Sequence, residues 1–283
     1  MKKLVFPLLA ASLFSCEWTN SSYPVSSSNE ESSNDDISSS DIETSIDQKE
    51  IDKESIADFI SYLEDIKGHS KQVNALMTNY YNFDGSDEAT LVGIDNFTAT
   101  RYSRNNASDI VIRKGIISIE GDTSNYEAQT FVSGSYVYQL VDTNGSKTKT
   151  SELDTLDTAE NALNISFAYT QIQNLEYLSS LIGNELVDYQ IDLPADYSIN
   201  GTLDFSYSLT IYKSSNEKSQ QISHEVSITV TKGVISKATH ITQTDVYTGN
   251  KIVNWNRVES SFSYLHGDYD EYMGNVFDIN EFN

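Results

Sequence analysis

Apolar and polar side chains alternate along two stretches in the C-terminal third of this 283-residue chain. A period of two places the apolar side chains of a β-strand on one face and the polar ones on the other. The apolar members are Leu203, Phe205, Tyr207, Leu209 and Ile211, followed by Ile222, Val226, Ile228 and Val230. Ser, Thr and acidic residues stand between most of them, so the sheet should have one buried and one wetted face.

Short turn sequences connect these strands to their neighbours. Residues 214–217, Lys232-Gly233 and Thr248-Gly249-Asn250 lead to two further strands near 234–247 and 251–264. Sequential strands joined by tight turns predict an antiparallel meander. A similar group is expected upstream, near 90–103, 109–120, 127–133 and 135–142, with another turn at Asn144-Gly145.

Two six-residue segments resemble each other. Residues 113–118 read Arg-Lys-Gly-Ile-Ile-Ser, and residues 231–236 read Thr-Lys-Gly-Val-Ile-Ser. We interpret both as a strand, a Lys-Gly turn and a second strand, which recur in any meander. An internal duplication is the alternative.

Two amphipathic helices are expected. The first has apolar residues at three- and four-residue steps, namely Ile56, Phe59, Ile60, Leu63 and Ile66, and Val73, Leu76 and Met77 could continue it past Gly68. The second covers about 158–182, where Asp157 and Glu160 have the spacing of a capping box and Gly183 ends the helix. Together with the strands, these helices predict a single α+β domain over residues 51–283, with the helices covering one face of the sheet.

The N-terminus has the features of a secretion signal. Two lysines precede an apolar run from Leu4 to Phe14, which is too short to span a bilayer. The following residues, Leu13-Phe14-Ser15-Cys16, resemble the lipobox of bacterial lipoproteins. The resemblance implies that residues 1–15 are a signal peptide, that Cys16 carries lipid with acyl chains such as palmitate, and that the protein lies on the outer face of the bacterial cytoplasmic membrane.

Residues 16–50 are rich in Ser and acidic residues and poor in large apolar ones. Such a segment cannot bury enough surface to fold, so we expect a disordered tether behind the lipidated Cys16. The whole chain carries a formal net charge of -24, which disfavours nucleic acid as a partner. Because the chain has one Cys, an intramolecular disulfide is excluded.

The order of the expected elements is similar to that of a known family. An N-terminal helix, antiparallel strands, a helical insertion and a closing meander resemble the curved half-barrel of bacterial lipoprotein carriers and mycobacterial glycolipid-binding lipoproteins. The resemblance covers about residues 51–264. It implies a curved sheet whose concave face is covered by helices and holds acyl chains, but no signature residue of the family can be carried over to this chain.

Motifs of catalysis are missing from the sequence. It contains no His-Glu-x-x-His, no Gly-x-Ser-x-Gly, no Gly-rich phosphate loop and no Cys pair. Ser215 and Lys218 match Ser-x-x-Lys, but they lie in an expected turn without partner motifs. We therefore expect a protein that is not an enzyme and uses no cofactor.

Several polar and aromatic clusters remain open to two interpretations. His224 and His240 lie on consecutive strands and could face each other, although histidines at the surface or at the edge of the core are the simpler reading. Two acidic clusters could bind Ca²⁺, although solvated turns are favoured and no metal is expected; they are Asp84, Asp87 and Glu88, and Asp268, Asp270 and Glu271. Aromatic residues near both clusters could stack on sugars or a partner, but core packing is favoured; they are Tyr80, Tyr81, Phe83, Tyr264, Tyr269, Tyr272 and Phe277.

The function expected from these features is a tethered lipoprotein that binds an apolar or lipid-like ligand between the sheet and the helices. The expected pocket walls are Phe167, Ile172 and Leu175 from the second helix and Phe205, Tyr207, Leu209, Val226 and Ile228 from the sheet. A packed core is the alternative reading of these residues. The alternative function is a tethered surface module for interaction or adhesion. Such a module has no internal cavity and binds a glycan or a protein whose identity the sequence does not reveal.

Overall fold

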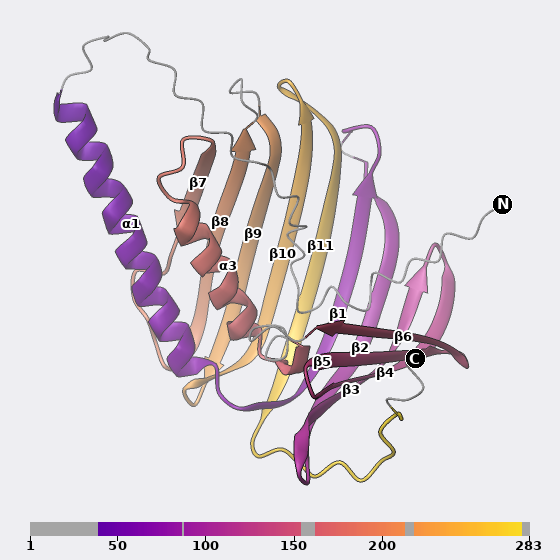
Figure 1. Cartoon of the computed structure of the whole chain (residues 1–283). Coiled ribbons are helices and arrows are strands. Elements are labelled where there is room, and N and C mark those ends of the chain that lie inside the picture. The colour runs from indigo at the N-terminus through magenta and orange to yellow at the C-terminus, as the bar shows by residue number, and fades with distance from the viewer. Residues whose placement is uncertain (1–38, 87, 154–161, 213–217, 279–283) are drawn as a thin grey trace.

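The computed structural model describes residues 39–86, 88–153, 162–212 and 218–278, in which one antiparallel sheet and two helices are labelled (Figure 1). The helices are α1 (Ser39–Ile66) and α3 (Phe167–Leu181). The strands are β1 (Ser70–Asn82), β2 (Thr90–Arg104), β3 (Ala107–Ile119), β4 (Asp122–Ser133), β5 (Tyr136–Thr143), β6 (Ser146–Leu153), β7 (Val187–Asp192), β8 (Gly201–Tyr212), β9 (Lys218–Thr231), β10 (Val234–Thr248) and β11 (Lys251–His266).

All described strands belong to one 11-stranded sheet with the order β6-β5-β4-β3-β2-β1-β11-β10-β9-β8-β7. Each half of the chain forms a meander, and the two meanders meet where β1 pairs with β11, from Ser70 opposite His266 to Asn82 opposite Trp255. The sheet is open, with β6 and β7 as its edges. Helix α3 lies between β6 and β7 in the chain.

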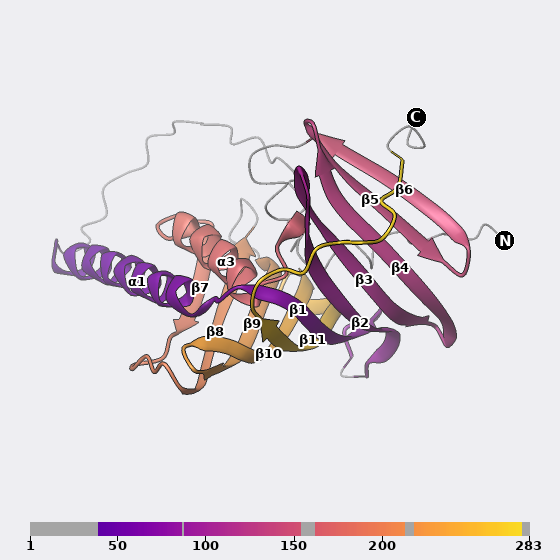
Figure 2. The same ribbon diagram turned by 90° about the horizontal axis from the view of Figure 1, so that it is seen from below.

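The sheet curves toward the helices, and both helices lie on one face of its β7–β11 half (Figures 1 and 2). The largest buried cluster lies between the helices and the sheet. Helix α1 contributes Ile56, Phe59, Leu63 and Ile66, and the sheet contributes the apolar residues of the alternating pattern that point toward the helices. The α+β class and the curved antiparallel sheet covered on one face by helices are therefore confirmed.

Most expected strands are confirmed. The strands expected upstream correspond to β2–β5, and those expected downstream correspond to β8–β11. Asn144-Gly145 and Lys232-Gly233 form the predicted turns, with φ values of 50° and 87° and of 55° and 78°. The segment 214–217 lies outside the described residues. Strands β1, β6 and β7 were not predicted.

The extension of the first helix past Gly68 is wrong. Helix α1 ends at Ile66, Gly68 has a φ of 62°, and the chain then enters β1. Val73, Leu76 and Met77 have helical spacing, yet they lie on a strand that pairs on both sides. Val73 is buried on the inner face, whereas Leu76 is 43% exposed, so the backbone pairing overrides the helical pattern.

The second helix is shorter than expected. Helix α3 begins at Phe167, and the amide of Ser166 donates to Asn164 Oδ1 at 2.8 Å in the non-helical segment before it. Asp157 and Glu160 lie outside the described residues. The end at Gly183, which has a φ of 101°, is as predicted.

The resemblance between residues 113–118 and 231–236 does not reflect equivalent turns. Lys232-Gly233 is a turn, but Gly115 lies in the middle of β3, opposite Phe97 and Tyr126. A Cβ atom at position 115 would lie 2.6 Å from Phe97 Cβ and 2.7 Å from the Asn96 carbonyl oxygen. This glycine is therefore required by close packing.

Helix α1 begins at Ser39, which precedes the domain boundary expected at residue 51. The signal peptide, Cys16 and residues 16–38 of the expected tether lie outside the described residues. In the described part of the chain, no helix combines the length and the apolar character that crossing a membrane requires.

After β11 the chain crosses the face of the sheet that the helices leave uncovered (Figure 2). The amide of Ser103 donates to the Asp270 carbonyl at 3.0 Å, and the amide of Tyr272 donates to the Ser103 carbonyl at 2.9 Å. Tyr272 and Val276 pack against a second-face cluster formed by Ile110, Ile112 and Phe131. We call residues 268–278 the C-terminal segment.

Candidate functional site

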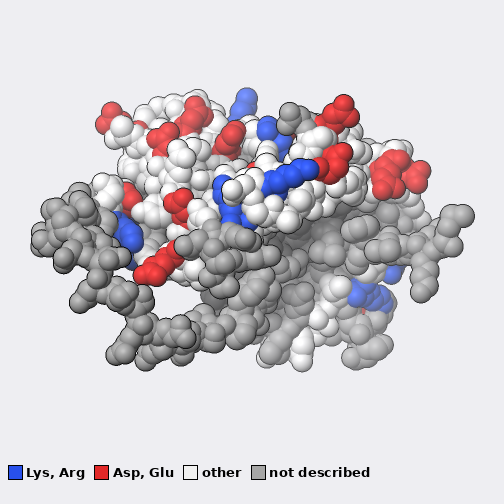
Figure 3. Space-filling view, turned by 90° about the horizontal axis from the view of Figure 1, so that it is seen from above, with Lys and Arg blue, Asp and Glu red and all other residues white. Residues whose placement is uncertain are grey.

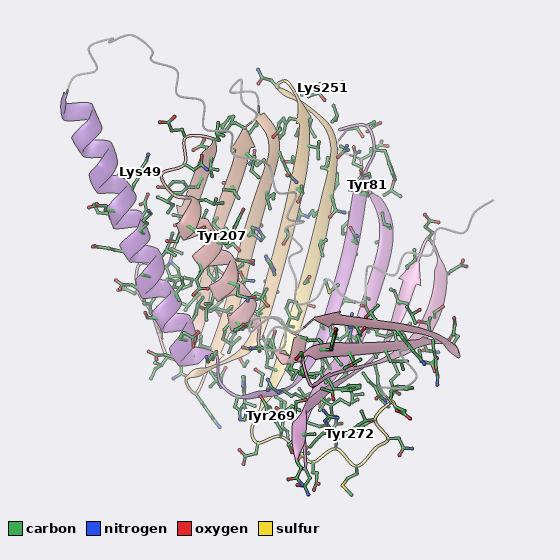
Figure 4. The ribbon with its side chains drawn as sticks, in the orientation of Figure 1. Lys49, Tyr81, Tyr207, Lys251, Tyr269 and Tyr272 are labelled. Atoms are coloured by element: carbon green, nitrogen blue, oxygen red, sulfur yellow. The ribbon has the colours of Figure 1, made fainter. Side chains whose placement is uncertain are left out.

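The side chains expected to line a pocket all meet in the structure. Phe167, Ile172, Leu175, Phe205, Tyr207, Leu209, Val226 and Ile228 belong to one buried cluster between α3 and β8–β9. Tyr207 lies behind α3 in Figure 4. Phe205 packs edge-on against Phe59 of α1, with ring centroids 4.7 Å apart. These side chains pack against one another as a core.

A cavity lies next to this cluster, where the two halves of the sheet meet. It has a volume of about 40 Å³ and is lined by Val73, Phe97, Ile165, Phe167, Thr170, His240, Phe262 and Tyr264. Of the expected pocket residues, Phe167 alone is among the lining side chains. The cavity has room for about one water-sized group, not for an acyl chain.

Polar side chains run through the apolar interface beside the cavity. The Tyr207 ring stacks on His224 at 4.5 Å, and the Tyr207 hydroxyl donates to Gln171 Oε1 of α3 at 3.4 Å. His224 Nδ1 lies 2.9 Å from His240 Nε2, and Thr242 Oγ1 lies 3.1 Å from the same His240 nitrogen. The two histidines therefore face each other, which is one of the two interpretations that the sequence allows.

The surface or edge reading of His224 is wrong, because this side chain is 2% exposed between α3 and the sheet. Register decides this: Tyr207 and Thr242 stand opposite His224 on the neighbouring strands, so all three point inward. Glu225, the next residue, points to the other face and does not reach the pair.

Burial disfavours the charged forms of both rings. It lowers the pKa of His240 from 6.5 to about 4. Burial, and secondarily the neighbouring His240, lowers the pKa of His224 well below 6.5. The pair is consequently neutral at pH 7 and offers hydrogen-bonding nitrogens without positive charge.

Helix α3 directs two amide side chains into the same interface. Gln171 is fully buried and Asn174 is 8% exposed. Among the described residues, Gln171 Nε2 and Asn174 Nδ2 have no hydrogen-bond partner. Since a buried donor without an acceptor is destabilising, these two groups are the feature of the interface that packing alone does not explain.

A buried ion pair lies on the concave face of the other half of the sheet. Arg113 of β3 pairs with Asp95 of β2, and Tyr126 of β4 donates to Asp95 Oδ1 at 2.9 Å. The Arg113 guanidinium also lies 3.8 Å from the centre of the Phe97 ring. Burial raises the pKa of the Asp95 carboxyl, and the attraction of Arg113 opposes this effect. These groups bond one another and do not line the cavity, so we assign them a structural role.

The other candidate residues are dispersed. Lys218 donates to Gln221 and lies over the Tyr247 ring, while Ser215 lies outside the described residues. Asp84 accepts a hydrogen bond from the Ser86 amide, and Asp270 pairs with Lys71 at 3.3 Å. Asp87 is not described. Within the described ranges, no three His, Cys, Asp or Glu side chains are arranged to hold a metal ion. Acidic and basic side chains are interspersed on the upper end of the molecule (Figure 3).

Sequence reasoning missed Gln171, Asn174 and Thr242. A signal for the two amides exists, because they lie three residues apart on the helical face that carries Ala168, Ile172 and Leu175, and buried polar groups are uncommon on such a face. Thr242 could be found only after the register of β9 and β10 was known.

Comparison with known proteins gives no family. No protein-family model matches the chain, and no curated protein sequence is detectably similar. Among solved structures, an outer membrane channel from Pseudomonas putida F1 aligns with 70% of this chain and 96% of its own, at 6% identity and a TM-score of 0.17. That score is too low to support any statement about the fold or function of this chain.

Proposed function

We propose that the protein is a membrane-anchored, extracytoplasmic lipoprotein without enzymatic activity, which binds an apolar or lipid-like ligand between α3 and the concave face of the sheet. The observation that carries the proposal is that α3 holds two buried amide donors, Gln171 Nε2 and Asn174 Nδ2, which have no hydrogen-bond partner among the described residues, while Phe167 and Thr170 of the same helix line a small cavity. An apolar pocket with a few convergent polar groups is the common form of a small-molecule site.

Binding would require α3 to move. The cavity of about 40 Å³ lies between the N-terminal end of α3, which contributes Phe167 and Thr170, and the sheet, which contributes side chains such as Val73 and Phe262. A lipid-like ligand would displace this end of the helix and replace its apolar contacts with its own. The Gln171 and Asn174 donors would then meet acceptor oxygens of the ligand, such as ester carbonyls.

The first experiment is mass spectrometry of an organic extract of the natively purified full-length protein, followed by titration with an environment-sensitive apolar dye. We expect a co-purified lipid at stoichiometric amounts, or saturable uptake of one dye per chain. Replacing Phe167 with Trp fills the cavity and should weaken dye binding, whereas Tyr177→Trp on the exposed face of α3 is the matched control. An empty extract together with no saturable dye uptake refutes the proposed ligand.

The anchor is tested separately by labelling growing cells with radioactive palmitate. The wild-type chain should incorporate the label, and the Cys16→Ser variant should not. Equal labelling of both proteins would refute anchoring through Cys16 without affecting the ligand proposal.

A further inference from the structure

A groove lies on the outer face of the sheet, opposite the helices. It runs between β4, β5 and the Asn144-Gly145 turn, and Phe277 of the C-terminal segment forms one wall. Its volume of about 450 Å³ falls in the range of about 300–1,000 Å³ that is typical of small-molecule sites. The groove is separate from the helix-covered face, so it is independent of the ligand site proposed above.

The C-terminal segment, which carries the aromatic wall, contacts several strands. The Lys147 ammonium of β6 lies 5.0 Å from the centre of the Phe277 ring. Tyr272, labelled in Figure 4, stacks at an angle on Tyr102 of β2 at 5.4 Å, and Val276 packs on the second-face cluster. The last described residues are thus seated on the sheet, with the Phe277 ring beside the polar floor of the groove.

Most polar groups of the groove are uncharged or balanced. Glu127 pairs with Lys114 at 2.9 Å, and Asp142 lies opposite Lys147 in the register of β5 and β6. Asp142 Oδ1 also accepts the Gly145 amide at 2.8 Å. Each carboxylate retains a further acceptor oxygen, because an ionised carboxylate has about four lone-pair sites.

Gln129 supplies the observation that points to a ligand. Its side chain lines the groove and is 6% exposed, and its Oε1 atom has no hydrogen-bond partner in the part of the chain that the structure describes. Its neighbours across the strands are Ile112 and Leu140, which are both buried and apolar. A buried acceptor in such surroundings is unfavourable unless a donor reaches it.

The ligand must therefore donate hydrogen bonds to closely spaced amide and carboxylate oxygens and must also offer an apolar surface to the Phe277 ring. The near balance of acids and lysines disfavours a strongly charged ligand. A sugar meets these conditions, because its hydroxyls donate and accept hydrogen bonds and its C–H face is apolar. We propose that this groove binds a neutral carbohydrate, with Gln129 and the carboxylates of Glu127 and Asp142 accepting hydroxyl protons and Phe277 stacking on the sugar ring.

The test uses the full-length chain carrying Cys16→Ser, which removes the lipid attachment position, and three neutral probes: maltotriose, cellotriose and chitotriose. Binding is measured by calorimetric titration and by saturation-transfer NMR. We expect at least one probe to bind saturably with a Kd of about 1 mM or lower. Gln129→Leu removes the acceptor and Phe277→Ala removes the aromatic wall, and each should weaken binding about tenfold or more.

Gln190→Leu makes the same chemical change as Gln129→Leu at an exposed position on β7 and should leave the affinity unchanged. Gln129→Leu should unfold at the same urea concentration as the wild type or at a higher one, because it replaces a buried acceptor that has no partner among the described residues with an apolar group. Loss of binding in this variant would therefore not reflect unfolding. The proposal is overturned if none of the three probes binds saturably, or if the affinity is unchanged in both groove variants.

Discussion

Protonation of the buried histidine pair should make the stability of the protein depend on pH. The perturbation is a shift from pH 7 to pH 4.5, with His240→Gln as the test variant. In the folded protein, burial lowers the pKa of His240 to about 4, whereas the unfolded chain has a histidine pKa near 6.5. Between these two values the unfolded state binds more protons than the folded state, so stability falls as the pH falls.

The magnitude follows from the difference between the two pKa values. One pKa unit corresponds to about 1.4 kcal/mol, so the full effect of His240 is about 3 kcal/mol. By pH 4.5 about 2 kcal/mol of it should be lost, because the folded ring itself begins to take up a proton near pH 4. His224, whose pKa burial also lowers, adds to the loss in the same direction.

The assay is urea unfolding followed by circular dichroism at a series of pH values. The many carboxylates also titrate in this range, so the informative quantity is the difference in pH dependence between wild type and variant. His240→Gln keeps a polar partner for His224 and Thr242 but cannot be protonated in this range, so its stability should fall less steeply. His69→Gln makes the same change at an exposed loop position and serves as control. Equal slopes for the wild type and His240→Gln would refute the assignment of His240 as a buried neutral ring.

Three substitutions test the packing, and a fourth, Asp109→Ala, serves as a control. Asp95→Ala leaves the Arg113 guanidinium buried without its carboxylate, and urea titrations should show a free energy of unfolding about 3–5 kcal/mol lower. Asp109→Ala breaks the more exposed pair with Arg101 and should lower the free energy of unfolding by about 1 kcal/mol or less. Gly115→Ala places a Cβ atom 2.6 Å from the nearest side-chain atom, so we expect a loss of about 1–3 kcal/mol by the same measurement, and an unchanged midpoint would contradict the close approach. Phe205→Ala should cost about 3–5 kcal/mol, and a loss below about 1 kcal/mol would show that this part of the interface is not tightly packed.

The strands that the sequence predicts correctly are those with one buried and one wetted face. In β8, Leu203, Phe205, Tyr207 and Leu209 are buried, and the residues between them are more exposed. Strands β6 and β7 lie at the edges of the sheet, and the polar residues of β6 give no alternating signal. The central strand β1 was mistaken for helix because Val73, Leu76 and Met77 have helical spacing, whereas in the strand Leu76 lies on the opposite face from Val73 and Met77.

Long-range contacts could not be predicted from local patterns. The period of a strand fixes which residues share a face, but not which strand pairs with it. The facing of His224 and His240 therefore became known only with the register of β9 and β10. The apolar side chains that pack between α3 and the sheet could be identified from the sequence because they are apolar, whereas Gln171 and Asn174 were missed because a polar residue on a helix is usually solvated.

The pairing of β1 with β11 has a consequence for how the chain folds. The two strands in the middle of the sheet are separated by almost the whole length of the domain, so the joint between the two halves cannot form until the last strand is available. Contacts of such long sequence separation slow folding. Until β11 pairs with it, β1 is an exposed edge strand that can pair with other chains. Chains that end before residue 251 should therefore retain secondary structure in the β1–β6 meander and yet aggregate.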